Sequence, residues 1–179
     1  TRADSGAARV LGHDVVAEAN AVHHEVVALT REELDVTDYD AVATRFEREL
    51  PAVVINCAAW TDVDGAEARE DDAFAINADG AGNVSAAAAH IGARIIHVST
   101  DYVFDGTKPD PYLEWDRPNP QSVYGRSKLG GELEVDPAWS IVRTSWVCGE
   151  HGNNMVKTLL RLGEGSGPLS FVDDQIGHP

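Results

Sequence analysis

Three short runs of apolar and β-branched residues alternate with helical stretches, and this alternation constrains the fold more than any other feature. The runs are Ala52–Cys57, Arg94–Ser99 and Ser140–Thr144. Continuous apolar strands of this length are typical of parallel sheets that are covered on both faces. The alternation therefore predicts an α/β fold with a doubly wound parallel sheet, Rossmann-like in architecture.

The segments between these runs have helical periodicity and recognisable ends. Thr37-Asp38 can cap one helix, and Gly92 can stop another. The region 105–121 is predicted to be an irregular loop, and loops of this length are usually functional. We expect helices over about Val10–Val22, Tyr39–Leu50, Ala66–Ile91 (with a break near Gly80), Val123–Glu134 and Asn153–Leu162, and further strands at Glu25–Leu29 and Leu169–Val172.

Length and charge exclude several classes of protein. A chain of 179 residues has room for one domain with a substantial core. Its formal net charge of −16 would repel nucleic acid and anionic membranes. Its apolar runs are too short to cross a bilayer. Cys57 and Cys148 lack the spacing of a disulfide framework or metal site, so we expect reduced thiols, no metal and a cytoplasmic protein.

The pair Tyr124 and Lys128 is the sharpest chemical signal. Residues four apart on a helix share a face, so the ammonium can lie near the phenol. A free tyrosine has a pKa of about 10, and a nearby cation would lower that pKa and make the side chain a usable general acid or base. Such a pair also occurs on solvated helices without any function. Thr100, at the end of a predicted strand, could place a hydroxyl at the same substrate oxygen.

Six segments, in the same order, match the pattern of a known family: Val54–Asp64, Ile76–Ala78, Ser99–Gly106, Asn119–Lys128, Val142–Val147 and Asp173–Gly177. They resemble the dTDP-4-dehydrorhamnose reductase family of the extended short-chain dehydrogenase/reductase superfamily. The resemblance implies hydride transfer from a reduced nicotinamide to the C4 ketone of a nucleotide-linked deoxysugar, giving dTDP-rhamnose. It also implies a nucleotide-sugar substrate and allows a homodimer.

The same resemblance assigns residues to the site. Thr100, Tyr124 and Lys128 would be catalytic, with Tyr124 the proton donor. Tyr124 and Lys128 would also contact the cofactor, together with Gly6, Gly12, Arg31, Asp35, Val36, Ala58, Ala59, Thr61, Asn77 and Ser99, and the substrate would meet Asp101, Val103, Phe104, Trp146 and Asn153.

The sequence departs from the family pattern at both ends. Arg9 stands at the middle glycine of the expected phosphate-binding loop, where it could block the phosphate or pair with it. The polar residues 1–4 do not resemble a buried first strand, so we expect the fold to lack that strand. At the other end, we expect most of the C-terminal substrate domain of the family to be missing. We expect a dinucleotide-binding part over 1–150 and the start of a sugar-nucleotide part over 151–179.

Two questions remain open from the sequence. Arg31 mildly favours NADPH over NADH, but it could equally offset the neighbouring glutamates. The alternatives to a reductase are an epimerase or dehydratase of the same superfamily, and a non-catalytic subunit like the regulatory subunit of methionine adenosyltransferase. The non-catalytic alternative is disfavoured by the presence of all three candidate catalytic residues, Thr100, Tyr124 and Lys128.

Overall fold

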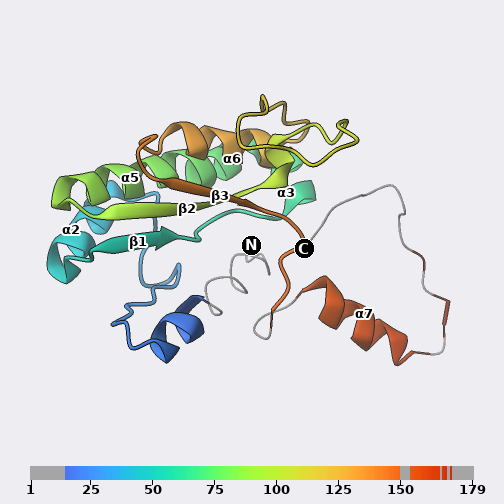
Figure 1. The fold of residues 1–179 in the computed structure, drawn as a ribbon, viewed down its shortest axis with the longest axis horizontal. Helices are drawn as coiled ribbons and strands as arrows, with labels where there is room; N and C mark the ends of the chain where they lie inside the picture. The colour runs from blue at the N-terminus through green and yellow to red at the C-terminus, as the bar shows by residue number, and fades with distance from the viewer. Residues whose placement is uncertain (1–14, 150–153, 166, 169, 171–179) are drawn as a thin grey trace.

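The computed structural model describes residues 15–149, 154–165, 167, 168 and 170, and its centre is a parallel sheet (Figure 1). Three strands lie in the order β1-β2-β3: Val53–Asn56, Arg94–Thr100 and Ser140–Thr144. Their pairing is in register and parallel throughout. The predicted α/β class and these three strands are confirmed.

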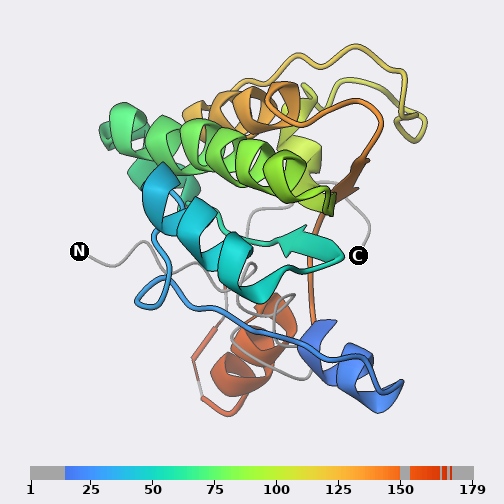
Figure 2. The same cartoon turned by 90° about the vertical axis from the view of Figure 1, so that its left-hand side faces the viewer.

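Helices cover one face of this sheet. The labelled helices are α2 (Tyr39–Glu49), α3 (Val63–Ala68), α4 (Glu70–Phe74), α5 (Gly80–Ile91), α6 (Val123–Leu133) and α7 (Met155–Gly163). α2 packs on α5, and α5 and α6 pack on β2 (Figures 1 and 2). The core between the helices and the sheet includes Val42, Phe46, Val84 and Ile95. α7 and the helical residues 15–21 lie on the opposite side of the sheet.

Two helix ends follow the chemistry expected from the sequence. The Asp38 carboxylate accepts a hydrogen bond from Ala41 N at 3.1 Å and caps α2. Gly92 ends α5 in the left-handed region, at φ 73°, where a residue without a Cβ is favoured. The predicted cap and the predicted stop signal are both confirmed.

The helix predicted over 66–91, with a break near Gly80, is in fact three α-helices, α3, α4 and α5, the last of which begins at Gly80. Arg69 leaves helical geometry between α3 and α4, with φ −141° and ψ 56°. A π-helical turn over Ala75–Asp79 then joins α4 to α5, and such turns occur frequently at functional sites. The turn contains Asn77, which is buried. Alanine-rich periodicity alone could not reveal it, because a π turn depends on tertiary partners.

The strand predicted over 25–29 is absent. These residues run without regular structure, and Val27 is 49% exposed. Within the described part of the chain, no strand lies beside them to complete a ladder, and a parallel strand is stable only when it is hydrogen-bonded to a neighbour. The predicted strand at 169–172 and the polar residues 1–4 lie outside the described residues. No described helix is long and apolar enough to cross a membrane.

Gly131 on α6 allows close packing against the π turn, because a Cβ at this position would collide with the Asn77 carbonyl oxygen. We predict that Gly131→Ala lowers the free energy of unfolding by about 1–3 kcal/mol, although alanine has the higher helix propensity. Chemical denaturation measures this change. Gly82→Ala on α5 is the matched control, because its Cβ would meet only the flexible Glu134 side chain. A gain of up to about 1 kcal/mol is expected there, and an equal loss in both variants would contradict the packing role.

Candidate active site

Helix α6 begins at a point that places its first turn at the carboxyl end of β2. The Ser122 hydroxyl caps α6 by accepting a hydrogen bond from Gly125 N at 3.0 Å. The Val123 N–H donates to the Glu67 carboxylate at 2.8 Å, which fixes α6 against α3. Both polar side chains of the predicted pair, Tyr124 and Lys128, are buried as a result.

Thr100 and Tyr124 meet at the end of β2, as the sequence predicted. The Thr100 hydroxyl lies close enough to the Tyr124 phenol to influence its pKa, and it donates a hydrogen bond to the Asp101 carboxylate at 3.2 Å. The Thr100 hydroxyl also accepts a bond from Tyr102 N at 3.2 Å, which starts a short 3₁₀ turn over Asp101–Val103. One strand end and one helix turn therefore bring two hydroxyls to a single point.

The predicted lowering of the tyrosine pKa is not found in this structure. Burial raises the pKa of Tyr124 to about 12, the nearby Thr100 hydroxyl opposes the rise, and the neighbouring Asp101 carboxylate adds to it. The Lys128 ammonium does not offset this burial because it is bound elsewhere. It donates to the Val98 carbonyl oxygen of β2 at 2.7 Å. In this state the phenol is therefore neutral and keeps its proton at physiological pH.

Lys128 is nearly inaccessible to solvent, and its environment is unfavourable for a charge. Burial lowers the pKa of Lys128 to about 8, while the nearby Glu132 carboxylate opposes that shift. Burial also raises the pKa of the neighbouring half-buried Cys57 thiol, and Lys128 opposes that rise. A modest change of surroundings can therefore change the charge of Lys128 near neutral pH.

Glu132 lies one turn beyond Lys128 on the same helix, and sequence reasoning missed it. Its buried carboxylate accepts a hydrogen bond from the Ser99 hydroxyl at 2.6 Å. It also accepts two bonds from Arg143 of β3, from Nε at 2.9 Å and from Nη2 at 2.6 Å. The spacing Tyr124, Lys128, Glu132 is the signal that could have identified it. The Ser99 hydroxyl, expected near the cofactor, is engaged by this carboxylate.

Asn77 holds the loop that follows β1 against α6. Its amide accepts a bond from Trp60 N at 2.7 Å and donates to Trp60 O at 3.0 Å and to the Ser127 hydroxyl at 2.9 Å. The Ala58 N–H in the same loop donates to the Asn56 side chain at 3.1 Å. The backbone around Ala58, Ala59 and Thr61 is thereby fixed, and the Asn77 side chain has a structural partner at each polar atom.

His97 of β2 is another buried polar residue that the sequence did not single out. Its Nδ1 lies 3.3 Å from the Asn56 amide nitrogen, and its Nε2 has no partner in the described part of the chain. Burial lowers the pKa of His97 to about 3, so the ring is neutral. A neutral ring accepting a bond from Asn56 supports the same loop.

The residues expected to face the substrate differ in their accessibility. Asp101 is half-buried beside Thr100, and burial raises its pKa. The Val103 side chain is fully buried, because its position in the turn after β2 directs it inward. Phe104 is half-buried and Trp146 is 41% exposed. Asn153 lies outside the described residues.

The residues expected at the adenosine end are partly brought together. Asp35 accepts bonds from the Thr37 N–H and hydroxyl, and these bonds lower its pKa. The Val36 carbonyl accepts a bond from Asn83 at 3.0 Å. Arg31 lines a cavity of about 180 Å³ together with Trp60, which neighbours Ala59 and Thr61. Gly6, Arg9 and Gly12 lie outside the described residues. Within the described ranges, no cluster of ligating side chains could hold a metal ion.

These observations define a Rossmann-like α/β chain with a threonine, a tyrosine and a lysine gathered where the central strand ends. The sequence matches the RmlD substrate binding domain family over residues 5–179. The chain belongs to this family.

Characterised relatives support the assignment. The chain is 47% identical to dTDP-4-dehydrorhamnose reductase of Mycobacterium tuberculosis, over 98% of this chain and 60% of that protein. It is 42% identical to dTDP-4-keto-6-deoxy-D-glucose reductase of Streptomyces niveus, over 98% of this chain and 62% of that protein. The chain therefore spans about three fifths of the length of these relatives.

Solved structures give the same result. A dTDP-4-dehydrorhamnose reductase of Clostridium acetobutylicum superimposes with a TM-score of 0.83 at 44% identity, covering 90% of this chain and 57% of that one. The reductase of Bacillus anthracis in complex with NADP also gives a TM-score of 0.83, at 41% identity, covering 89% of this chain and 58% of that one. The predicted family and fold are confirmed.

Asn77 provides a direct test of how the site is held together. We predict that Asn77→Ala lowers the free energy of unfolding by about 2–4 kcal/mol, because it leaves the buried backbone polar groups of Trp60 without their partner. Asn83→Ala is the control, since that amide makes one bond, to the Val36 carbonyl, and should cost about 1 kcal/mol or less. Urea titration of both variants measures the difference. Equal small losses of unfolding free energy would show that Asn77 does not hold the loop after β1 against α6.

Proposed function

We propose that the protein is a reductase that transfers a hydride from NADPH to the C4 ketone of dTDP-4-dehydrorhamnose, giving dTDP-rhamnose. The observation that carries this proposal is the convergence of Thr100, Tyr124 and Lys128 at the carboxyl end of β2. Ligands of open parallel sheets bind at this edge. The names of the relatives, and the NADP bound in the Bacillus anthracis structure, support the substrate and the cofactor.

The residues at this edge fit a dinucleotide. The loop after β1 carries two half-buried alanines, Ala58 and Ala59, whose small side chains permit close approach of a ring system. When bound, the reduced nicotinamide supplies the hydride. NADPH is preferred over NADH because Arg31, beside the cavity near Trp60, can pair with a 2′-phosphate.

The neutral Tyr124 phenol is suited to donate a proton. As the hydride adds to the ketone carbon, its oxygen becomes an alkoxide, which is a stronger base than a phenolate. The O–H bond of Tyr124 breaks, and its proton forms the new hydroxyl. Thr100 donates a hydrogen bond to the same oxygen and stabilises the developing charge. Lys128, released from Val98, would contact the nicotinamide ribose and stabilise the phenolate that remains.

The other site residues follow from the same proposal. Asp101, Phe104, Trp146 and Asn153 would face the sugar nucleotide, with Val103 contributing through its backbone. The cofactor would contact Gly6, Gly12, Asp35, Val36 and Thr61, with Asn77 and Ser99 shaping the cleft from behind. We assign dinucleotide binding to residues 1–150 and the start of the sugar-nucleotide part to 151–179.

We also propose that the protein forms a homodimer and that it is located in the cytoplasm. The two free cysteines in the structure, Cys57 and Cys148, support a reducing compartment.

We predict that Tyr124→Phe lowers kcat for ketone reduction by about 10²–10⁴-fold, the usual contribution of a general acid. NADPH affinity should stay within about twofold because the ring and its packing remain. NADPH oxidation followed by absorbance measures the first quantity, and fluorescence titration with NADPH measures the second.

Tyr102→Phe is the matched control for this variant. The Tyr102 ring packs edge-on against Tyr124, with centroids 5.4 Å apart, but is 40% exposed. Its activity should be close to that of the native protein. Full activity in Tyr124→Phe would remove the proton-donor role. Redox-neutral turnover of a nucleotide sugar, without net NADPH consumption, would instead identify an epimerase or dehydratase.

A further inference from the structure

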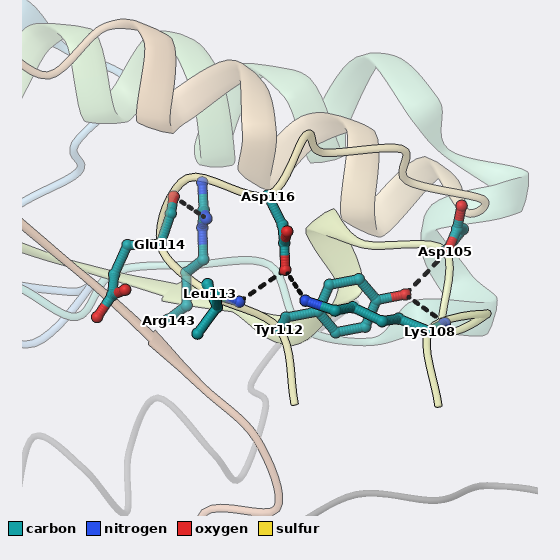
Figure 3. Close-up of polar contacts among 7 residues, drawn as sticks. All are labelled: Asp105, Lys108, Tyr112, Leu113, Glu114, Asp116 and Arg143. Carbon is teal, nitrogen blue, oxygen red and sulfur yellow. Dashed lines mark hydrogen bonds and ion pairs between the residues drawn. The ribbon is translucent and has the colours of Figure 1, made fainter. Parts of the chain in front are cut away.

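The loop after the 3₁₀ turn is organised by its own polar contacts. Asp105 accepts bonds from the Thr107 N–H and hydroxyl, from the Tyr112 hydroxyl at 2.9 Å and from Asn119 at 2.9 Å. These bonds hold the pKa of Asp105 well below its usual range. Lys108 forms an ion pair with Asp116, as Figure 3 shows. The segment 104–116, hereafter the 104–116 loop, is therefore a bonded unit.

Arg143 is the side chain that connects this loop to the core. Its guanidinium lies 5.0 Å from the centre of the Phe104 ring, and that ring stacks on Tyr112 with centroids 4.1 Å apart. Its Nη1 is 3.5 Å from the Glu114 carbonyl oxygen (Figure 3). On its other side, the same guanidinium makes two bonds to the buried Glu132 carboxylate.

Glu132 continues the connection to the site. It belongs to α6, two turns after Tyr124, and it also holds the Ser99 hydroxyl next to Thr100. A buried carboxylate requires a cation in place, and a planar guanidinium can bond it through a fork while stacking on a ring. The Arg143 guanidinium does both, because it bonds the Glu132 carboxylate and lies over the Phe104 ring. Arg143 therefore links Phe104 of the loop to Glu132 of α6 through a single side chain.

We propose that Arg143 is a positioning residue that holds the 104–116 loop in place over the carboxyl end of β2 and so sets the affinity for the sugar nucleotide. The inference rests on the proposed function, because Phe104 and Asp101 are the groups assigned there to the substrate. Arg143 is not among the residues assigned to the reacting atoms. Its effect passes through Phe104 on one side and Glu132 on the other.

Arg143→Lys tests this role because it keeps a cation beside Glu132 but loses the planar fork and the flat stacking surface. We expect amide hydrogen exchange in residues 104–119 to accelerate by at least about tenfold while exchange in α5 is unchanged. We also expect KM for the sugar nucleotide to rise by about tenfold, with kcat within about threefold of the native value.

Two further variants keep the test decisive. Arg126→Lys is the control, since Arg126 of α6 makes an exposed pair with Glu70 of α4 at 3.7 Å, and neither measurement should change. Arg143→Gln with Glu132→Gln removes both charges, so no buried carboxylate is left without a partner if the single variants fold poorly. The double variant should also show accelerated exchange in 104–119.

The outcomes separate the two proposals. Native loop exchange and native KM in both Arg143→Lys and the double variant would overturn the positioning role. A native protein that oxidises no NADPH with the sugar nucleotide would overturn the proposed function, and the exchange measurement would still decide whether Arg143 orders the loop. A loss of thermal stability with unchanged loop exchange would make Arg143 a purely structural residue and contradict the proposal.

Discussion

The contact between α6 and β2 is the constraint on which the site depends. Three polar side chains of α6, one turn apart, each meet β2: Tyr124 meets Thr100, Lys128 meets the Val98 carbonyl, and Glu132 meets Ser99. All of them are buried, so each requires a partner, and leaving one unpaired would cost more than its bond contributes. The register between helix and strand is therefore fixed by polar complementarity as well as by apolar packing. That register places the two hydroxyls of the site together.

Burial has opposite consequences for the two titratable groups of this contact. It holds the tyrosine in its neutral form, which is the form a proton donor needs, and it brings the lysine pKa close to physiological pH. In the structure described here, the ammonium is satisfied by a backbone carbonyl instead of by the phenol. A negatively charged or polar ligand at the sheet edge would offer Lys128 a competing partner. The fold thus holds the Lys128 ammonium close to Tyr124 and Thr100, where the proposed reaction would take place.

Local sequence patterns predict part of the fold and of the site but not the remainder. The strands and the Tyr124–Lys128 pair could be predicted because their periodicities are local, and Thr100 could be placed because parallel strands end at a common edge. The engagement of Asn77 with Trp60 and the pair of Glu132 with Arg143 join residues 17 and 11 apart through the fold, and no local spacing encodes them. The predicted phenol pKa was wrong because helical spacing gives proximity but not the direction of the ammonium. Residues 25–29 have strand composition, but a strand also requires a neighbour.

The burial of Lys128 against β2, on which the geometry of the site depends, can be measured by a lysine titration. The chain has three lysines, Lys108, Lys128 and Lys157, so side-chain ¹⁵N resonances can be followed individually through a pH titration. One Nζ resonance should titrate near pH 8, and it should be missing from Lys128→Met. If every Nζ resonance instead titrates in the ordinary range of a lysine, about 10.4, Lys128 is solvated and the described contact between α6 and β2 does not exist in solution.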